Sequence, residues 1–445
     1  LEKWPVHLLG KVLPRHLPII YEINRRFLDQ VTAYSPADNE LLVSMSIIEE
    51  GDNKQVRMSN LAIVGSHKVN GVSKLHSNLL QNRNFRQFND FYPQKFVNIT
   101  NGVTPRQWLL QCNPPLSQLI SSRLGPKWIT DLPRLQELIP LASDPEFHRE
   151  WRQAKLQNKK RLAHYILRKT GHGVDPKSLF DVQVKRIHEY KRQLLNVLHV
   201  ITLYNRLREE KDWHTPARTI IFSGKAAPGY AKAKLIIKLI NEVARTVNND
   251  LWIQNQLKIV FLPNYCVSSA EKIVPGTELS QQISTAGLEA SGTGNMKFAL
   301  NGALLIGTLD GANIEILDHV GQENIFIFGH NAEEIYELRN NDYDPFYYYY
   351  KDLELRKALD MVSTGYFCPQ EPYLFKPLVD SLLYGKDPFM LLADYRSYVD
   401  TQYQAGKLYL NQEEWTRRSI LNTANMGYFS SDRCINEYCQ KIWKV

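Results

Sequence analysis

The sequence lacks several features that would assign it to a membrane, secreted or metal-binding class. It contains no apolar run of about 18 residues, so it predicts no membrane-spanning helix. Its five cysteines are an odd number without CxxC spacing, which argues against a disulfide framework and a zinc site. No signal peptide, internal repeat or low-complexity linker is visible. We therefore expect a cytoplasmic protein without membrane segments and without a metal site.

Long basic tracts are also absent, although the chain is basic overall. Its 54 Lys and Arg residues against 46 Asp and Glu residues give a net charge of +8, but these cations are spread along the sequence. Such a distribution favours a mixed surface with a few local anion sites over a nucleic-acid-binding groove. We therefore expect no nucleic-acid partner.

The length of 445 residues is sufficient for two or more domains. The chain opens with Leu-Glu-Lys-Trp instead of Met, inside what reads as folded sequence, so we expect it to be part of a longer protein. A turn at Asn101-Gly102 and a helix start at Thr104-Pro105 indicate a change of domain. We place a first domain at residues 1–97 and a second at residues 98–445.

Short apolar segments alternate with helical ones in the second domain. This order predicts βαβ units, a parallel sheet and an α/β fold. The expected strands are 180–184, 219–222, 258–262, 304–307 and 325–328, and helices are expected at 193–208 and 230–247. In the first domain, apolar runs at 44–48 and 61–64 also predict strands.

The stretch 289–298, Glu-Ala-Ser-Gly-Thr-Gly-Asn-Met-Lys-Phe, is the first candidate site. Gly292 and Gly294 flank Thr293 before an expected helix, where backbone N–H groups can approach an anion. Lys297 follows, and its amine could bind an aldehyde cofactor that carries a phosphate. The order of residues fits neither a P-loop nor a dinucleotide fingerprint. An ordinary glycine-rich turn with an exposed lysine has the same local pattern.

A second candidate site follows the expected strand 180–184. Segment 185–192 holds five groups that are or can become cationic, at the strand end where α/β folds bind phosphates. A solvated basic loop is the alternative interpretation. Polar residues also follow the other strands, at 224–229, 264–265 and 310–315, so a shared cleft at this edge is expected.

The stretch 289–298 resembles the pyridoxal-phosphate signature of the α-glucan phosphorylases, the enzymes of glycogen, starch and maltodextrin breakdown. Further blocks resemble this family in the family's order, across nearly the whole chain. They lie at 4–9, 14–17, 100–106, 181–195, 224–230 and 310–313.

This resemblance implies the C-terminal half of a two-lobed GT-B glycosyltransferase. Residues 1–97 would be the end of the N-terminal lobe, and residues 98–445 the Rossmann-like, cofactor-binding C-terminal lobe. The implied reaction is reversible phosphorolysis of α-1,4-glucan to α-D-glucose 1-phosphate with retention, dependent on pyridoxal 5'-phosphate. The implied partners are the glucan, inorganic phosphate and glucose 1-phosphate, and a homodimer is implied for the full-length protein.

The resemblance also implies roles for individual residues. Lys297 would hold pyridoxal phosphate as a Schiff base, and the cofactor's phosphate would be its working group. Lys185, Thr293 and Gly294 would bind that phosphate, and Trp108 would form a wall of the cofactor site. The catalytic cations facing the substrate phosphate would be Arg186 and Lys191, supported by Lys185. The positions that match contacts to the terminal glucose are Asn101, Tyr265, Glu289, Ala290, Ser291 and Gly292.

Two alternatives to a glucan phosphorylase remain at this point. One is a truncated, catalytically inactive module that binds pyridoxal phosphate or glucan, because most of the N-terminal lobe would be missing. The other is a pyridoxal enzyme that transforms amino acids.

Overall fold

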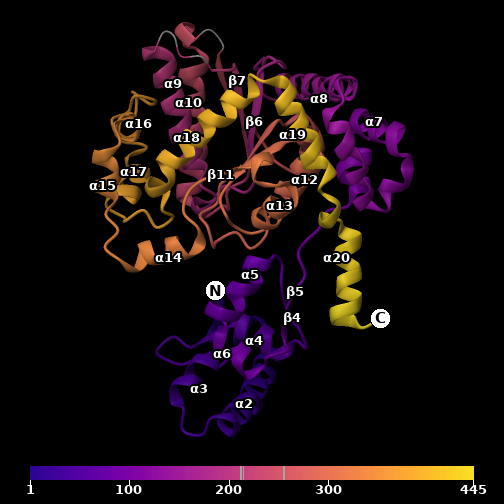
Figure 1. Ribbon diagram of the computed structural model, residues 1–445. Helices are drawn as coiled ribbons and strands as arrows, with labels where there is room; N and C mark the ends of the chain where they lie inside the picture. Colours follow the sequence, from indigo (N-terminus) through magenta and orange to yellow (C-terminus); the bar gives the residue numbers. More distant parts are fainter. Residues whose placement is uncertain (211–212, 214, 254–255) are drawn as a thin grey trace. The chain divides into compact units, whose positions relative to one another are not determined.

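The computed structural model describes residues 1–210, 213, 215–253 and 256–445. Figure 1 shows the chain as two compact units, residues 1–99 with 437–445, and residues 100–436. Among the described residues, no helix has both the length and the apolar character needed to cross a membrane.

The first unit contains two small sheets and several helices. Strands β1 (Lys3–Pro5), β3 (Gln55–Arg57) and β2 (Ile48–Glu49) pair antiparallel in that order, and β4 (Val69–Gly71) pairs parallel with β5 (Phe96–Asn98). The helices are α1 (Val6–Val12), α2 (His16–Tyr34), α3 (Asn39–Met45), α4 (Met58–Gly65), α5 (Lys74–Leu79), η1 (Leu80–Asn84), α6 (Arg86–Phe91) and η9 (Cys439–Trp443).

Two strand predictions for this unit are wrong. Residues 61–64 lie in helix α4, and residues 44–45 end helix α3, so that only the short strand β2 follows. A short apolar run has no periodicity that separates a buried strand from a buried helix. In α4 the run places Ile63 in a small core with Phe27, and the ring of Phe27 stacks on Phe88 at 5.8 Å between centroids.

The second unit is built on one parallel sheet of six strands, which confirms the predicted α/β class. Its spatial order is β11-β10-β9-β6-β7-β8, and every neighbouring pair is parallel. This is the strand order of doubly wound Rossmann-type sheets, in which ligands bind where the order reverses. The strands are β6 (Leu179–Val184), β7 (Arg218–Ser223), β8 (Leu257–Leu262), β9 (Leu279–Gln282), β10 (Leu304–Gly307) and β11 (Phe326–Ile327).

Five of these strands match the predicted ones, but β9 has no counterpart among the predictions. Its sequence, Leu-Ser-Gln-Gln, is polar, yet all four residues are buried. Their side chains find partners inside the sheet, where Nε2 of Gln281 donates to Asp181 and Nε2 of Gln282 donates to Oγ of Ser280 over 2.9 Å. Hydrogen bonding of this kind removes most of the penalty for burying amides.

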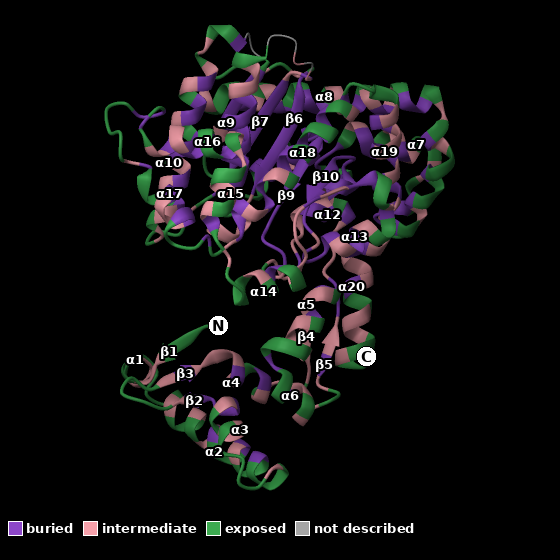
Figure 2. Ribbon diagram, turned by 60° about the vertical axis from the view of Figure 1, so that its left-hand side comes forward, coloured by how far each residue is buried: buried purple, intermediate pink, exposed green. Residues whose placement is uncertain are grey.

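Helices cover both faces of this sheet (Figure 1). Along β7, Ile220 and Phe222 join one core while Ile221 joins the other, as expected from the alternation of side chains in a strand. Figure 2 shows the resulting burial of β6 and β7 along their whole length. The parallel sheet is therefore buried on both faces, as βαβ crossovers require.

The long helices of this unit confirm the predicted alternation, and the C-terminal part is mainly helical. The expected helices at 193–208 and 230–247 correspond to α9 (Gln193–Glu209) and α10 (Ala231–Asn248). The others are η2 (Arg106–Gln111), α7 (Pro114–Leu124), η3 (Pro126–Ile129), η4 (Leu132–Ser143), α8 (Pro145–Thr170), η5 (Glu189–Lys191), η6 (Leu251–Ile253), α11 (Val267–Gly276), α12 (Gly294–Leu300), α13 (Asn313–Val320), η7 (Gln322–Asn324), α14 (Ala332–Asn340), α15 (Pro345–Lys351), α16 (Leu353–Ser363), α17 (Lys376–Leu383), α18 (Leu391–Tyr409), α19 (Gln412–Ala424), η8 (Gly427–Phe429) and α20 (Ser431–Tyr438).

Candidate active site

The candidate site lies at the carboxyl ends of β6 and β9, where the strand order reverses. Lys185 directly follows β6, and its Nζ donates a hydrogen bond to Oε1 of Gln282, the last residue of β9, over 2.9 Å. Burial and, to a smaller extent, the nearby Lys191 lower the pKa of Lys185 to about 8, against the opposing effect of Glu289 and Asp310. The two central strands thus bring a partly desolvated cation to the crevice.

Segment 185–192 does not direct all of its cations to this crevice. Arg186 is exposed, whereas the side chain of Arg192 is fully buried and its Nη1 lies 2.6 Å from Oδ2 of Asp394. Nε of Arg192 also donates to the carbonyl oxygen of Ile283 over 2.8 Å, which fixes the segment that leaves β9. The hypothesis of a shared anion site is therefore wrong for Arg192. Its partner, Asp394, lies far along the chain, so no local sequence pattern could predict this ion pair.

Lys191 forms an ion pair with Glu289, and both side chains are largely buried. Burial lowers the pKa of Lys191, but the neighbouring Glu289 outweighs it, so the pKa stands above the usual value for lysine. The hydroxyl of Tyr190 donates to the same carboxylate oxygen over 3.3 Å. This pair ties the basic segment to the stretch 289–298, and it holds Lys191 as a permanent cation at neutral pH.

Asp310 organises the loop that carries Glu289. Its buried carboxylate accepts hydrogen bonds from the backbone N–H groups of Gly287, Glu289 and Gly311, each over 2.9 Å, and from Oγ of Ser284 over 3.0 Å. Burial raises the pKa of Asp310 to about 6, although these donors favour the charged form. One carboxylate thus fixes three backbone positions of a loop that has no regular secondary structure.

A cavity of about 380 Å³ surrounds the amine of Lys297. Lys297 lies on α12, and its Nζ is 4.0 Å from the centroid of the Trp108 ring. Burial lowers the pKa of Lys297, which favours the neutral amine that attacks an aldehyde. The cavity is lined by Trp108, Arg186, Lys225, Tyr265, Cys266, Val267, Ala270 and Lys297.

These residues fit an aldehyde cofactor that carries a phosphate. The volume is in the range of small-ligand sites, the Trp108 ring offers a flat apolar wall, and Arg186 and Lys225 supply cations for a phosphate. Within the described ranges, no group of three or more His, Cys, Asp or Glu side chains could hold a metal ion. The donor set therefore suits an organic anion with an amine-reactive group.

A family model described as carbohydrate phosphorylase matches residues 1–445. The chain belongs to the carbohydrate phosphorylase family. Among curated relatives, it is 53% identical over 445 residues to a glycogen phosphorylase of Chlamydia pneumoniae and 53% identical to one of Synechocystis. It is 51% identical to the muscle-form glycogen phosphorylase of Oryctolagus cuniculus. All of this chain is covered in each case, but only 54%, 52% and 53% of the three relatives, so the chain spans about half their length.

Two further predicted residues of this phosphorylase chain, Thr293 and Gly294, lie at the start of the helix that carries Lys297. The carbonyl of Thr293 accepts from the Lys297 N–H over 3.2 Å, and α12 begins at Gly294. Gly292 has φ +72°, a backbone conformation that is unfavourable for residues with a Cβ atom. The turn before α12 therefore requires glycine.

The remaining predicted sugar contacts lie in the loop 289–292 or on the segment that enters this unit. Ala290 and Ser291 lie between Glu289 and Gly292, and the Ser291 carbonyl accepts from the N–H of Ala312 over 2.8 Å. Asn101 lies elsewhere and does not line the Lys297 cavity, and its carbonyl accepts from Nη2 of Arg433 over 3.2 Å.

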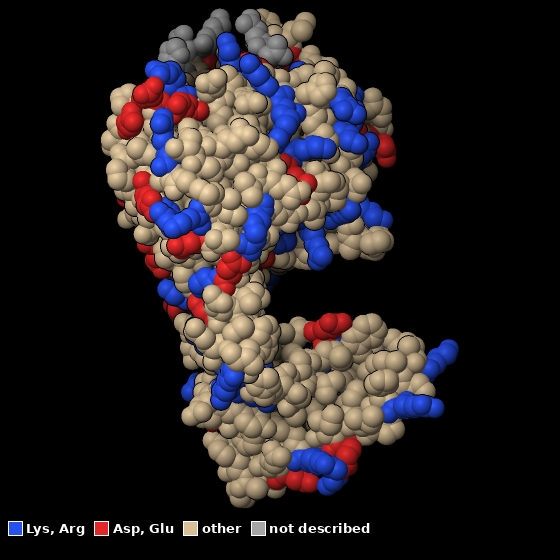
Figure 3. Space-filling view, turned by 90° about the vertical axis from the view of Figure 1, so that its right-hand side faces the viewer, with Lys and Arg blue, Asp and Glu red and all other residues tan. Residues whose placement is uncertain are grey.

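The sequence interpretation included the loop 224–229 in the expected cleft but did not single out Lys225 as a site residue. A Cβ on the preceding Gly224 would lie 2.2 Å from the carbonyl oxygen of Lys185, so only glycine lets the two strand-end loops meet. The position of Lys225 directly after such a glycine, at a strand end, was the available signal. On the face drawn in Figure 3, basic and acidic groups are both present, and neutral surface separates many of them.

Proposed function

We propose that this chain is the cofactor-binding half of an α-1,4-glucan phosphorylase, which converts glucan and inorganic phosphate reversibly to α-D-glucose 1-phosphate with retention. The observation that carries the proposal is the amine of Lys297 against Trp108, in a cation-lined cavity of a chain that belongs throughout to the phosphorylase family. The names of the relatives, glycogen phosphorylase, support the glucan as substrate.

Lys297 would tether pyridoxal 5'-phosphate, with Trp108 as a wall and with Lys185, Thr293 and Gly294 around its phosphate. Its lowered pKa supports this role, because the neutral amine is the reactive form. When bound, the cofactor would supply a phosphate group that assists proton transfer at the substrate phosphate.

Arg186 and Lys191 would bind the substrate phosphate, with Lys185 beside them. Arg186 lines the Lys297 cavity, and Lys191 is held by Glu289 near the end of β6. Three cations around two phosphates would offset their repulsion and stabilise the charge that moves during the reaction. Because Arg binds phosphate oxygens in pairs, Arg186 would also orient the group.

The glucose unit would be bound by Asn101, Tyr265, Glu289, Ala290, Ser291 and Gly292. Backbone and side-chain groups of a rigid loop can select sugar hydroxyls, and Asp310 supplies the rigidity through four hydrogen bonds. Tyr265 lines the Lys297 cavity, which supports a position beside the reacting groups.

The same proposal includes the fold and the assembly. Residues 98–445 would be the C-terminal lobe of a GT-B enzyme and residues 1–97 the end of its N-terminal lobe. The Rossmann-type strand order supports the assignment of the C-terminal lobe. The full-length enzyme would be a cytoplasmic homodimer.

The decisive experiment measures glucose 1-phosphate after the protein, loaded with pyridoxal phosphate, is given maltooligosaccharide and inorganic phosphate. Product formation is expected. Full cofactor occupancy without product would instead favour the inactive binding module. Borohydride should fix the pyridoxyl group on Lys297 and spare phosphorolysis, whereas an amino-acid-transforming enzyme would lose its activity.

A further inference from the structure

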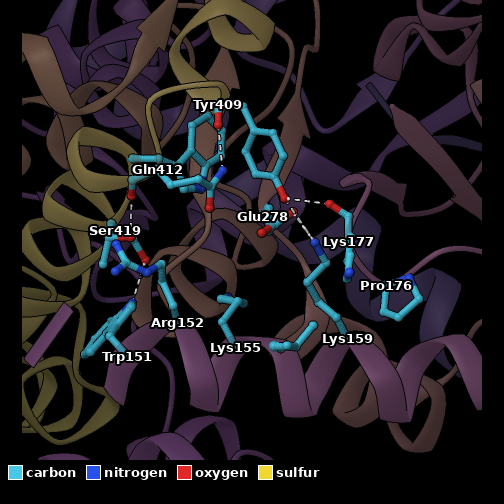
Figure 4. A pocket seen from close by; sticks show the side chains of 13 residues that line it. Trp151, Arg152, Lys155, Lys159, Pro176, Lys177, Glu278, Tyr409, Gln412 and Ser419 are labelled. Carbon is cyan, nitrogen blue, oxygen red and sulfur yellow. Dashed lines mark hydrogen bonds and ion pairs between the residues drawn. The ribbon is translucent and has the colours of Figure 1, made fainter. Parts of the chain in front are cut away.

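A second cavity opens at the opposite edge of the six-stranded sheet, where the strands begin (Figure 4). Its volume is about 390 Å³. Glu278, at its floor, directly precedes β9, and Lys159 reaches the carbonyl oxygen of Ser178, which directly precedes β6, over 2.7 Å. Helix α8 forms one wall, and the end of α18 with the start of α19 forms the other.

The walls of this cavity offer flat apolar surface. The rings of Tyr409 and Trp415 meet edge to face at 5.0 Å between centroids, and Trp151 lies opposite on α8. All three are more than nine-tenths buried. Rings held this rigidly can contact an aromatic ligand with little loss of side-chain entropy.

The charges of the lining do not cancel. Lys159 pairs with Glu278 over 2.6 Å, and Arg152 pairs with Glu413 over 2.6 Å. Lys155 and Lys177 also line the cavity, and in the described part of the chain neither forms an ion pair. An anionic ligand would supply the carboxylate partner that both lysines lack among the described residues.

Among the described residues, the hydrogen-bond acceptors of Lys155 are neutral groups. Its Nζ donates to the carbonyl oxygens of Thr277 and Asn301 over 2.8 Å and of Pro275 over 3.2 Å. Burial lowers the pKa of Lys155 to about 7, with Glu278 opposing and Lys159 adding to the effect. An anion in the cavity would stabilise its charged form, because Coulomb attraction is strong in such a desolvated place.

The same lysine connects the cavity to the helix of Lys297. Asn301 is the C-terminal cap of α12, and its Nδ2 donates to the carbonyl oxygens of Lys297, over 2.9 Å, and Trp108, over 2.5 Å. Ser419, in the cavity wall, donates to the carbonyl oxygen of Gly302 over 2.5 Å. The wall of one cavity therefore holds the end of the helix that carries the amine of the other.

We propose that this cavity binds a small aromatic carboxylate, with its ring against Tyr409 and Trp415 and its anionic group near Lys155 and Lys177. Binding draws Lys155 towards the ligand, weakens its bond to Asn301 and so changes how α12 presents Lys297. This second step rests on the proposed function, whereas binding itself does not.

The binding test uses two matched probes, 3-phenylpropanoate and its uncharged amide, measured by isothermal titration calorimetry. The carboxylate should bind at least about tenfold more tightly than the amide, because only it compensates the two lysines. Lys177→Gln, at an exposed position, should weaken carboxylate binding about threefold or more, and Lys155→Met should remove the preference for the carboxylate. Lys169→Gln, an exposed lysine of α8 outside the cavity, should change nothing.

Equal binding of the two probes to the unsubstituted protein, or no binding of either, would overturn the site without relying on any variant. The second readout is the rate at which pyridoxal phosphate attaches to Lys297, measured by mass spectrometry after borohydride reduction. Saturating carboxylate should change this rate at least about twofold and the amide should not. An unchanged rate would overturn the coupling. No attachment even without a probe would count against the proposed function alone, because calorimetry is independent of it.

Discussion

The two edges of the six-stranded sheet both hold partly or fully buried lysines, but in different states. At the amino edge, Lys155 and Lys159 each donate three hydrogen bonds to oxygens of the protein. At the carboxyl edge, the amine of Lys297 lies over the Trp108 ring, and Lys185 donates to Gln282. Lys155 and Lys159 therefore hold elements together, and Lys155 reaches a ligand only by giving up one of its bonds, whereas Lys185 and Lys297 have few acceptors and keep hydrogen-bonding capacity for a ligand.

This difference has a physical origin in the fold. Helix α8 passes the starts of the strands, where backbone carbonyls of the preceding turns remain without ladder partners and accept from its lysines. At the other edge, loops and helix starts present N–H groups, which cannot accept a hydrogen bond from an ammonium group. The carboxyl edge therefore suits anions, and Lys185 and Lys297 keep hydrogen-bonding capacity there for a ligand, whereas Lys191 and Arg192 are paired with carboxylates.

The largest effect is expected for Lys297→Met. This change should remove covalent attachment of pyridoxal phosphate and lower phosphorolysis by roughly 10³-fold or more, because the cofactor loses its tether. Unfolding by urea should be nearly unchanged, since Lys297 has no ion pair within the described residues and methionine preserves the apolar stem. A large loss of stability together with activity would show that Lys297 is a structural residue like those at the other edge.

A lysine-to-methionine change at the amino edge should lower the stability of the fold, in contrast to Lys297→Met, which should lower activity. Lys159→Met leaves the buried Glu278 without its cation, which should cost about 3–5 kcal/mol in the free energy of unfolding. The matched control, Lys376→Met, removes an exposed pair with Asp380 and should cost less than about 0.5 kcal/mol. Urea unfolding of both variants measures the difference, and equal costs would contradict the assignment of Lys159 as a structural cation.

Asp310→Asn should lower kcat/KM by about 10–100-fold through a displaced loop, because the amide replaces one of two accepting oxygens. Attachment of the cofactor to Lys297 should persist, which separates this effect from misfolding. The pKa of Asp310 is raised to about 6, so the unsubstituted protein should lose activity below about pH 6 as the carboxylate becomes protonated.

This loss of activity below about pH 6, the acid limb of the pH profile, should disappear in Asp310→Asn, because its side chain does not titrate. Asp318→Asn, on the exposed side of α13, is the control and should keep both the limb and the activity. An unchanged limb in Asp310→Asn would assign the titration to another group.

Much of the sheet and of its carboxyl edge could be predicted from the sequence, because local patterns determine where strands end. Apolar runs followed by polar loops located five strands of the sheet, and the carboxyl-edge candidates Lys185 and Lys297 followed from their positions after a strand and before a helix. The resemblance to glucan phosphorylases then indicated which chemistry to expect at these positions.

The features that could not be predicted from the sequence depend on contacts between residues far apart in the chain. Strand β9 is polar, and its burial becomes favourable only when Asp181 and Tyr398 supply partners for Gln281. The Arg192–Asp394 pair joins residues 202 positions apart. The amino-edge cavity has no motif, because Lys155 and Lys159 belong to an ordinary polar helix and Lys177 to an ordinary turn until β9 and α19 are placed against them.

The smallest effect is expected from the titration of Lys185. Its pKa is lowered to about 8, so kcat/KM, which reports the free enzyme, should fall about twofold at pH 8 and further above it as the cation is lost. In Lys185→Arg the guanidinium stays charged, so this fall of kcat/KM, the basic limb of the pH profile, should move to higher pH. Lys191→Arg is the control, because the pKa of Lys191 is already raised by Glu289 and it should not titrate in this range. A limb that moves in the control and not in Lys185→Arg would reverse the roles of the two lysines and make Lys185 a structural cation.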